Sequence, residues 1–394
     1  MARLLRTSDT DACPGALRLH PAADGLVARV RLVGGMLTGG RLRALRVLAQ
    51  ELGDGCLELT SRANLQIRGL QAEGAEILAA RLRDAGLLPS LTHDPVRNIA
   101  APPLAGPGLR ALVARLDDAI LADPGLPRLP GKFLFAIGVV PIASDVAAVP
   151  AGDRFAIRFA GHDTGLRVAA DRVVSTMVAA AHAFLAEREA QRGDGPAVWR
   201  LRELDDGPAR VTGRLGLVTE PVAVATPVPA VEPGGLLGVL EQPDGGYAAG
   251  ALVPLGRLTP VPMEVLEAAD QLVVTPWRGV IVADLSRSAA AAWTERLIAA
   301  GLATAADSRW VGVTACAGLP GCARSRADVR ADAATASRFV DGLPVHWVGC
   351  ERGCGSPMGR HVRVEATTDG YRVDDAPVRE EQELGDLVAA ARTA

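Results

Sequence analysis

One pattern of strands and helices occurs twice in the chain, and this duplication limits the possible folds more than any other feature. Residues 25–38 align without gaps with residues 246–259, and residues 57–70 align with residues 272–285. The helix expected between the paired segments is shorter in the second copy. Similarity repeated over such a distance predicts two copies of one supersecondary unit. The matched positions are Gly25/Gly246, Gly35/Gly256, Thr60/Thr275 and Leu70/Leu285.

The first copy predicts a strand–helix–strand–helix unit. Apolar and basic residues alternate from 27 to 33, as in a half-buried strand, and leucines recur at helical spacing from 41 to 52. Residues 57–68 alternate so regularly that we expect one long strand, whose even positions form a polar face containing Arg62 and Arg68. A helix over 73–85 should cover its apolar face.

The two copies differ in charge. Arg29 and Arg31 of the first copy align with Gly250 and Leu252 of the second, and Arg62 aligns with Trp277. Guanidinium groups are the side chains best suited to carboxylates and other anions. We therefore expect anion binding to belong mainly to the first half of the chain.

Segments of a second type follow each copy, so the chain has the order A-B-A′-B′. Pro, Val, Ala and Gly dominate from 207 to 235, which is typical of a linker. The chain is long enough for several domains. We expect an α+β fold of mixed sheets with covering helices, divided into domains at 1–90, 91–206, 234–305 and 306–394 with a linker at 207–233.

Four of the six cysteines lie in one block, as a C-x5-C pair and a C-x3-C pair rich in glycine and proline: Cys316, Cys322, Cys350 and Cys354. This arrangement favours ligation of an iron–sulfur cluster. Zinc binding remains an alternative, although the C-x5-C spacing is wider than the cysteine spacing usual in zinc sites. Four unligated thiols are a further alternative. Cys13 and Cys56 stand alone and are expected to be free thiols.

Composition excludes several classes of function. The formal net charge is −3 and only 3% of residues are aromatic, which argues against nucleic-acid binding. No apolar run is long enough for a membrane helix, and the first residues lack the apolar core of a secretion signal. We expect a cytoplasmic protein without disulfides.

Three motifs, together with the A-B-A′-B′ order, resemble the sulfite and nitrite reductase haemoprotein superfamily, and within it the precorrin-3B synthase family. They are the segment TSRANLQIRG at 60–69, the sequence TPWR ending at Arg278 and the cysteine block. The resemblance covers nearly the whole chain. It implies a pseudo-twofold duplicated fold whose first and third parts are ferredoxin-like half domains. It also implies a [4Fe-4S] cluster held by the four cysteines, in the last part only.

The resemblance further implies which residues bind a tetrapyrrole. In the reductases, basic residues hold the carboxylates of sirohaem and the substrate anion, and the last cysteine bridges the cluster to the haem iron. The matching positions here are Arg29 or Arg31, Arg62, Arg97 and Lys132. Where the reductases carry a second lysine, this chain has Leu134. That difference disfavours reduction of sulfite or nitrite, which needs a dense cationic cage.

The implied activity is oxygen-dependent hydroxylation of precorrin-3A at C20, with closure of a γ-lactone, in aerobic cobalamin biosynthesis. A sirohaem-dependent sulfite or nitrite reductase is the alternative. His346 and His361 are candidate ligands for an oxygen-activating mononuclear iron; no catalytic residue is assigned. The family uses NADH, yet no G-x-G-x-x-G follows a strand here, so we expect electrons to arrive through a donor protein.

Overall fold

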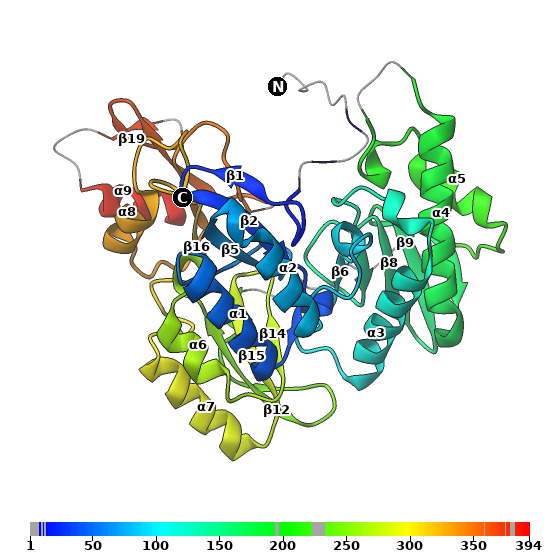
Figure 1. Ribbon diagram of the computed structural model, residues 1–394, viewed down its shortest axis with the longest axis horizontal. Coiled ribbons are helices and arrows are strands. Elements are labelled where there is room, and N and C mark those ends of the chain that lie inside the picture. Colours follow the sequence, from blue (N-terminus) through cyan, green and yellow to red (C-terminus); the bar gives the residue numbers. More distant parts are fainter. Residues whose placement is uncertain are drawn as a thin grey trace.

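The computed structural model describes residues 8, 11, 13–193, 197–222, 233–357, 359–374, 376–378 and 383–394. Within them the strands form four five-stranded sheets, two in the half domains and two in the parts that follow them. Figure 1 shows residues 99–193 and 197–215 as a lobe on the right and the C-terminal part at the upper left. None of the helices described is both long and apolar enough to span a membrane.

The first half domain is a sheet in the order β1-β2-β5-β4-β13. Its strands are β1 (His20–Ala22), β2 (Gly25–Val30), β4 (Leu57–Leu59), β5 (Leu65–Leu70) and β13 (Arg257–Leu258). Helices α1 (Gly39–Leu52) and α2 (Ala75–Asp84) bury their leucines against one face of it. Helix α1 begins where the Thr38 hydroxyl accepts a hydrogen bond from the N–H of Arg41, a standard N-cap.

The second half domain repeats this arrangement in the order β11-β12-β15-β14-β3. Its elements are β11 (Gly238–Glu241), β12 (Tyr247–Leu252), β14 (Leu272–Val274), β15 (Gly279–Leu285), α6 (Pro260–Leu266) and α7 (Arg287–Ala299). Its last strand is β3 (Met36–Leu37) from the first half, just as β13 from the second half completes the first sheet. This exchange of edge strands joins the two half domains around one continuous core.

The other two sheets also share one topology. In each, the first three strands are parallel and the last two antiparallel. The first is built from β6 (Ile99–Ala100), β7 (Phe135–Ile137), β8 (Val146–Ala151), β9 (Arg154–Phe159) and β10 (His162–Val168), with α3 (Pro107–Ala122), α4 (Val173–Ala190) and α5 (Gly207–Leu215). The second is built from β16 (Val313–Ala315), β17 (Val345–Val348), β18 (Val362–Thr367), β19 (Gly370–Val373) and β20 (Ala376–Pro377), with α8 (Val329–Ala336) and α9 (Leu384–Thr393).

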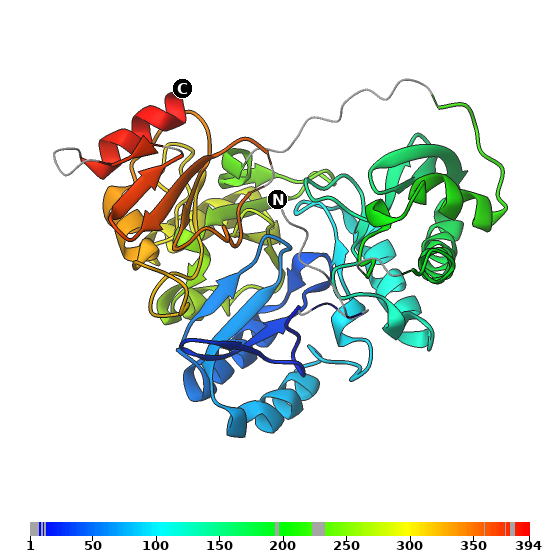
Figure 2. The same ribbon diagram turned by 90° about the horizontal axis from the view of Figure 1, so that it is seen from above.

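The predicted pseudo-twofold α+β fold is therefore confirmed, and each of the last two sheets has a core of its own. Figure 2, seen from above, again shows α3 to α5 on the right and the C-terminal part at the upper left.

Two predictions about local structure were wrong. Residues 57–68 form a hairpin, β4 and β5, instead of one strand, because the chain turns at Ala63, which has a φ of +55°. Strict alternation does not reveal such a turn, since both strands keep the same inside–outside pattern. Residues 207–215 of the predicted linker form α5, because Val211 is buried against the core of the preceding part; residues 223–232 lie outside the described residues.

Candidate functional site

A cavity of about 430 Å³ lies where the two halves of the chain meet. Four arginines and two tryptophans line it, and no Asp or Glu among the described residues does so. A volume of this size lies within the range of ligand-binding pockets in proteins, and walls of this composition favour a ligand that is flat and anionic. The residues are Arg62, Arg200, Arg202, Arg278, Trp277 and Trp310.

The duplicated hairpins bring cations to this cavity from both halves. Arg62 lies in the β4–β5 turn, and Arg278 lies in the equivalent β14–β15 turn. Ala63 and Arg278 occupy the same position in the two hairpins and both have positive φ, +55° and +62°. The second copy thus also supplies a cation, although three of the four arginines that line the cavity come from the first half, where most of the anion binding was expected. The second copy supplies its guanidinium one residue after the position that aligns with Arg62.

Arg200 is held at the cavity wall by a buried carboxylate. Its Nε donates to Oδ1 of Asp145 at 3.0 Å, and the same carboxylate accepts the N–H groups of Leu201 and Leu134, each at 2.8 Å. Asp145 is 1% exposed. Sequence reasoning missed Arg200 and Arg202 because they follow the long helix in a segment without a repeat partner, and only the folded chain brings them beside Arg62.

The four cysteines of the block follow the ends of neighbouring strands. Cys316 comes directly after β16, and Cys350 comes two residues after β17, which pairs with β16 in parallel. The carboxyl ends of parallel neighbours meet at one sheet edge, so these two cysteines are brought together, and the N–H of Gly349 points at the Cys316 sulfur at 3.3 Å. Cys354 is exposed as a residue. Partial shielding of its thiol from solvent raises the pKa of Cys354, and the other three thiols raise it further against the opposing charge of Arg352.

Within the residues that the structure describes, no group of three or more His, Cys, Asp or Glu side chains is arranged to hold a single metal ion. A cluster makes a different demand, because its four thiolates each bind a different iron and stand further apart. The surrounding backbone is built for close packing: a Cβ on Gly349 would lie 1.8 Å from the Ser325 hydroxyl. Four thiols converging on tightly folded glycine-containing loops fit such a cluster.

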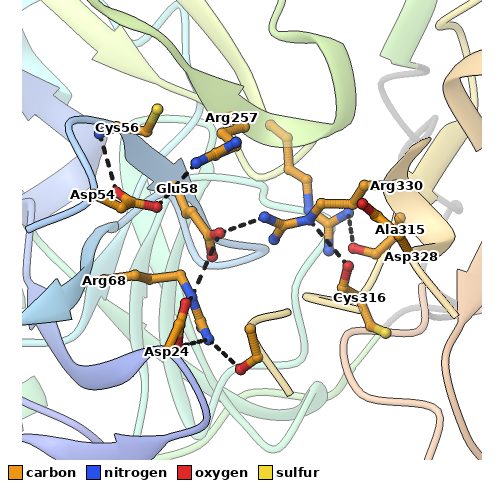
Figure 3. Close-up of polar contacts among 12 residues, drawn as sticks. Asp24, Asp54, Cys56, Glu58, Arg68, Arg257, Ala315, Cys316, Asp328 and Arg330 are labelled. Atoms are coloured by element: carbon orange, nitrogen blue, oxygen red, sulfur yellow. Dashed lines mark hydrogen bonds and ion pairs between the residues drawn. The ribbon is translucent and has the colours of Figure 1, made fainter. Parts of the chain in front are cut away.

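Charged side chains at the contact between the first half domain and the C-terminal part hold the cysteine segment in place (Figure 3). Arg330 donates through Nε to the Cys316 carbonyl at 3.1 Å and through Nη1 to Oε1 of Glu58 on β4 at 2.6 Å. Arg68 on β5 donates to the Gly321 carbonyl at 2.7 Å and pairs bidentately with Asp24. Glu58 lies 3.8 Å from Arg68 and connects the two contacts. The first half domain thus positions the loop from 316 to 322.

Glu58→Gln is expected to weaken this attachment. Glu58 is 7% exposed, and the neutral amide would leave Arg330 without its anionic partner in a largely buried site. We expect a loss of about 1–3 kcal/mol in unfolding free energy, together with faster bleaching of any cluster by a chelator. The matched control is Glu51→Gln, whose exposed pair with Arg81 should contribute less than about 1 kcal/mol. Equal bleaching rates in the two variants would contradict the positioning role.

Of the five predicted substrate-binding cations, Arg62 alone lines the cavity. Arg31 is 2% exposed, donates to Asn98 and lies 3.7 Å from Asp94, and Arg97 pairs bidentately with Asp117. The structure therefore gives Arg31 and Arg97 internal partners. Each still has one buried Nη1 without a hydrogen-bond partner.

The remaining two predicted cations lie close to other side chains. Burial lowers the pKa of Arg29, whose neighbours include the Cys13 thiol, and its buried Nε has no hydrogen-bond partner. The Lys132 ammonium lies 4.7 Å from the centroid of the Trp199 ring. Cys13 and Cys56 are free thiols, as expected.

Leu134, at the position where the reductases have a lysine, is 2% exposed and does not line the cavity. Its backbone N–H donates to Asp145 at 2.8 Å. The position therefore belongs to the core of the second part of the chain.

His346 does not fit the predicted role of an iron ligand. It is fully buried, and burial with the nearby charge of Arg278 lowers its pKa to about 3, so the ring is neutral. Nε2 donates to the Cys354 carbonyl at 3.1 Å, which leaves Nδ1 to accept from the Thr314 hydroxyl at 2.8 Å. Both ring nitrogens are used within the protein, and His346 supports the last cysteine instead. Nδ1 of His361 is likewise 2.9 Å from the Gly359 carbonyl.

Comparison with known proteins relates this geometry to a group of oxidoreductases. Residues 19–85 match the family model of the nitrite/sulfite reductase ferredoxin-like half domain. A precorrin-3B synthase of Sinorhizobium sp is 28% identical, over 91% of this chain and 81% of its own length. A ferredoxin–nitrite reductase of Synechococcus elongatus is also 28% identical, over 91% and 80%.

A solved structure shares the fold. The NirA protein of Mycobacterium tuberculosis superposes with a TM-score of 0.73 at 18% identity, covering 93% of this chain and 79% of that one. A likeness at this identity concerns the fold, and it extends over nearly all of the chain.

Proposed function

Because this chain belongs to the sulfite and nitrite reductase superfamily, we propose that it is a tetrapyrrole monooxygenase, a precorrin-3B synthase that hydroxylates precorrin-3A at C20 and closes the γ-lactone. The relatives that cover most of the chain are oxidoreductases, so an enzyme of that class is the starting point. The finer assignment depends on the site.

The observation that carries the proposal is the cavity lined by four arginines and two tryptophans beside the cysteine segment. A precorrin is a large ring fringed with acetate and propionate groups. Guanidinium groups bind carboxylates bidentately, and indole rings provide flat apolar surface for the ring itself. Each partly desolvated carboxylate contact contributes about 1.5–3 kcal/mol. The absence of acidic side chains from the described lining leaves nothing to repel the carboxylates.

The cavity and the cysteine segment adjoin one another. Thr314 and Gly355 line the cavity, two residues before Cys316 and one residue after Cys354 respectively. A [4Fe-4S] cluster bound by Cys316, Cys322, Cys350 and Cys354 would supply single electrons to the reaction. The residues of the chain would then fix the orientation of the tetrapyrrole relative to that electron source. No histidine pair for a mononuclear iron is part of the proposal, because His346 is fully engaged.

A sirohaem-dependent sulfite or nitrite reductase is the second candidate, favoured by the nitrite reductases among the relatives. Sirohaem is also a polycarboxylate tetrapyrrole, and the same cavity would suit it. The two candidates differ in what must surround a small oxyanion. Leu134 replaces one of the lysines that the resemblance requires for that cage, and its side chain is buried away from the cavity.

We further propose that a separate acidic protein delivers electrons that derive ultimately from NADH. Arginines on the two loops that carry the four cysteines are exposed, and Cys354 is itself exposed. These arginines outnumber the exposed acidic residues of the same loops, Asp328 and Glu351, and an excess of positive charge beside an exposed redox site favours encounter with a donor of opposite charge. The exposed arginines are Arg324, Arg326, Arg352 and Arg360.

The experiment that tests the proposed function is the absorption spectrum of anaerobically purified protein, followed by turnover. A broad cluster shoulder without haem bands, and oxygen-dependent conversion of precorrin-3A when a donor system is added, are expected. Strong sirohaem bands with sulfite or nitrite reduction would replace the proposal with the second candidate. Oxidation of NADH by the purified protein alone, with substrate and oxygen present, would show that no separate donor protein is needed and would overturn that part of the proposal.

A further inference from the structure

Arg278 occupies an unusual place between the cavity and the cysteine segment. It lies in the β14–β15 turn with a φ of +62°, a conformation that costs a residue with a side chain of this size of order 1 kcal/mol. The side chain lines the cavity, yet its Nη1 also lies 3.4 Å from the carbonyl of Ala315, the residue before Cys316. Arg278 therefore touches the cavity and the cysteine segment together.

The guanidinium of Arg278 has no anionic partner in the described part of the chain. Ala315 is its one recorded hydrogen-bond acceptor there, at a distance near the limit for such a bond, and no Asp or Glu forms an ion pair with it. Glu58 and the Cys316 thiol are close enough to influence its pKa. The carboxylate of Glu58 is occupied by Arg330 and lies near Arg68, and Cys316 is one of the four cysteines proposed to hold the cluster. Burial, reinforced by Arg330, lowers the pKa of Arg278 to about 10, so the group remains charged at neutral pH.

A charged group in such surroundings is costly unless something pairs with it. Three other partly buried arginines of this protein have carboxylate partners: Arg68 has Asp24, Arg97 has Asp117 and Arg200 has Asp145. Arg278 differs from them because its open side is the cavity. Two glycines leave room for it, since a Cβ on Gly355 would lie 3.2 Å from Nη2 and one on Gly256 would lie 2.7 Å from Cδ.

We propose that Arg278 binds a carboxylate of the tetrapyrrole at the end of the cavity next to the cysteine segment, and thereby sets which edge of the ring faces the cluster. This inference rests on the proposed function and makes it more specific. Arg62, from the equivalent hairpin of the first half, would bind a carboxylate on the other side of the pseudo-twofold. The duplication of the fold then explains why one cavity holds cations from both halves.

The test is a binding titration with uroporphyrin III, a stable ring with eight acetate and propionate carboxylates, followed by quenching of tryptophan fluorescence. Arg278→Gln is expected to raise its Kd by about ten- to a hundred-fold. Arg278→Lys, which keeps the charge but loses bidentate pairing, should raise it several-fold. The control is Arg296→Gln, on the outer helix α7 and stacked on Trp293, which should bind like the wild type.

Cluster content separates a ligand from a merely structural residue. The proposal expects Arg278→Gln to keep the labile sulfide and melting temperature of the wild type while binding more weakly. If that variant fails to fold, Arg278→Lys decides, and wild-type affinity in it would overturn the proposal. Equal Kd values for Arg278→Gln and wild type would overturn it while leaving the proposed function intact. Failure of the wild type itself to bind uroporphyrin III would overturn both.

Discussion

Replacing Cys322 with alanine is expected to remove the iron–sulfur cluster and the activity together. Cys322 is one of the three thiols close enough to raise the pKa of Cys354, and the loop that carries it is fixed by the bond from Arg68 to the Gly321 carbonyl. A [4Fe-4S] cluster needs four thiolates, and ligand binding of this kind is coupled to the folding of the loops that supply them. Iron content, labile sulfide and the visible absorption of anaerobically purified protein measure the loss.

The control for this variant is Cys56→Ala. Cys56 is a buried free thiol in the first half domain, outside the cysteine block, and burial raises its pKa, as expected for an inert thiol. The Cys56→Ala variant should keep the full iron and sulfide content of the wild type. If Cys322→Ala retained both sulfide and activity, Cys322 would not be a ligand, and the zinc and free-thiol alternatives would have to be considered again.

The largest expected effect on stability comes from Asp145→Asn. The Asp145 carboxylate pairs with Arg200 and accepts two backbone N–H groups, so all its neighbours are donors. An asparagine amide would place its own N–H₂ against one of those donors and would leave the buried Arg200 uncompensated. Breaking a buried pair on one side costs about 3–5 kcal/mol. Urea unfolding followed by circular dichroism should show a midpoint lowered accordingly.

Asp153→Asn is the matched control, because Asp153 is exposed in the turn between β8 and β9 of the same sheet. Such a surface change is expected to stay within about 0.5 kcal/mol of the wild type. Similar midpoints for the two variants would show that Asp145 does not hold this part of the chain together. Because Asp145 also orients Arg200, its variant should bind uroporphyrin III more weakly even where it remains folded.

The outcome for particular residues shows where sequence reasoning succeeded. The glycines shared by residues 25–38 and 246–259 predicted the duplicated fold, since Gly35 and Gly256 both adopt positive φ in equivalent turns. The regular alternation from 57 to 68 led to the wrong prediction of a single strand, because a hairpin with a five-residue turn has the same inside–outside pattern. Arg62 was identified through its motif. Arg278 stood in the aligned segment, but a position-by-position comparison with Arg62 passed over it by one residue.

The sequence by itself determined the repeat, the cysteine block and the residue types that a polycarboxylate ring requires, because periodicity and spacing are local properties of the chain. Only the tertiary structure decided which cations share the cavity. Arg31 and Arg97 have Asp94 and Asp117 as neighbours, whereas Arg62, Arg200 and Arg278 come from three separate segments to line one cavity. Whether an arginine is paired or open to a ligand depends on which carboxylates the fold brings near it. Those carboxylates can lie far from the arginine in the sequence, so the local pattern does not reveal them.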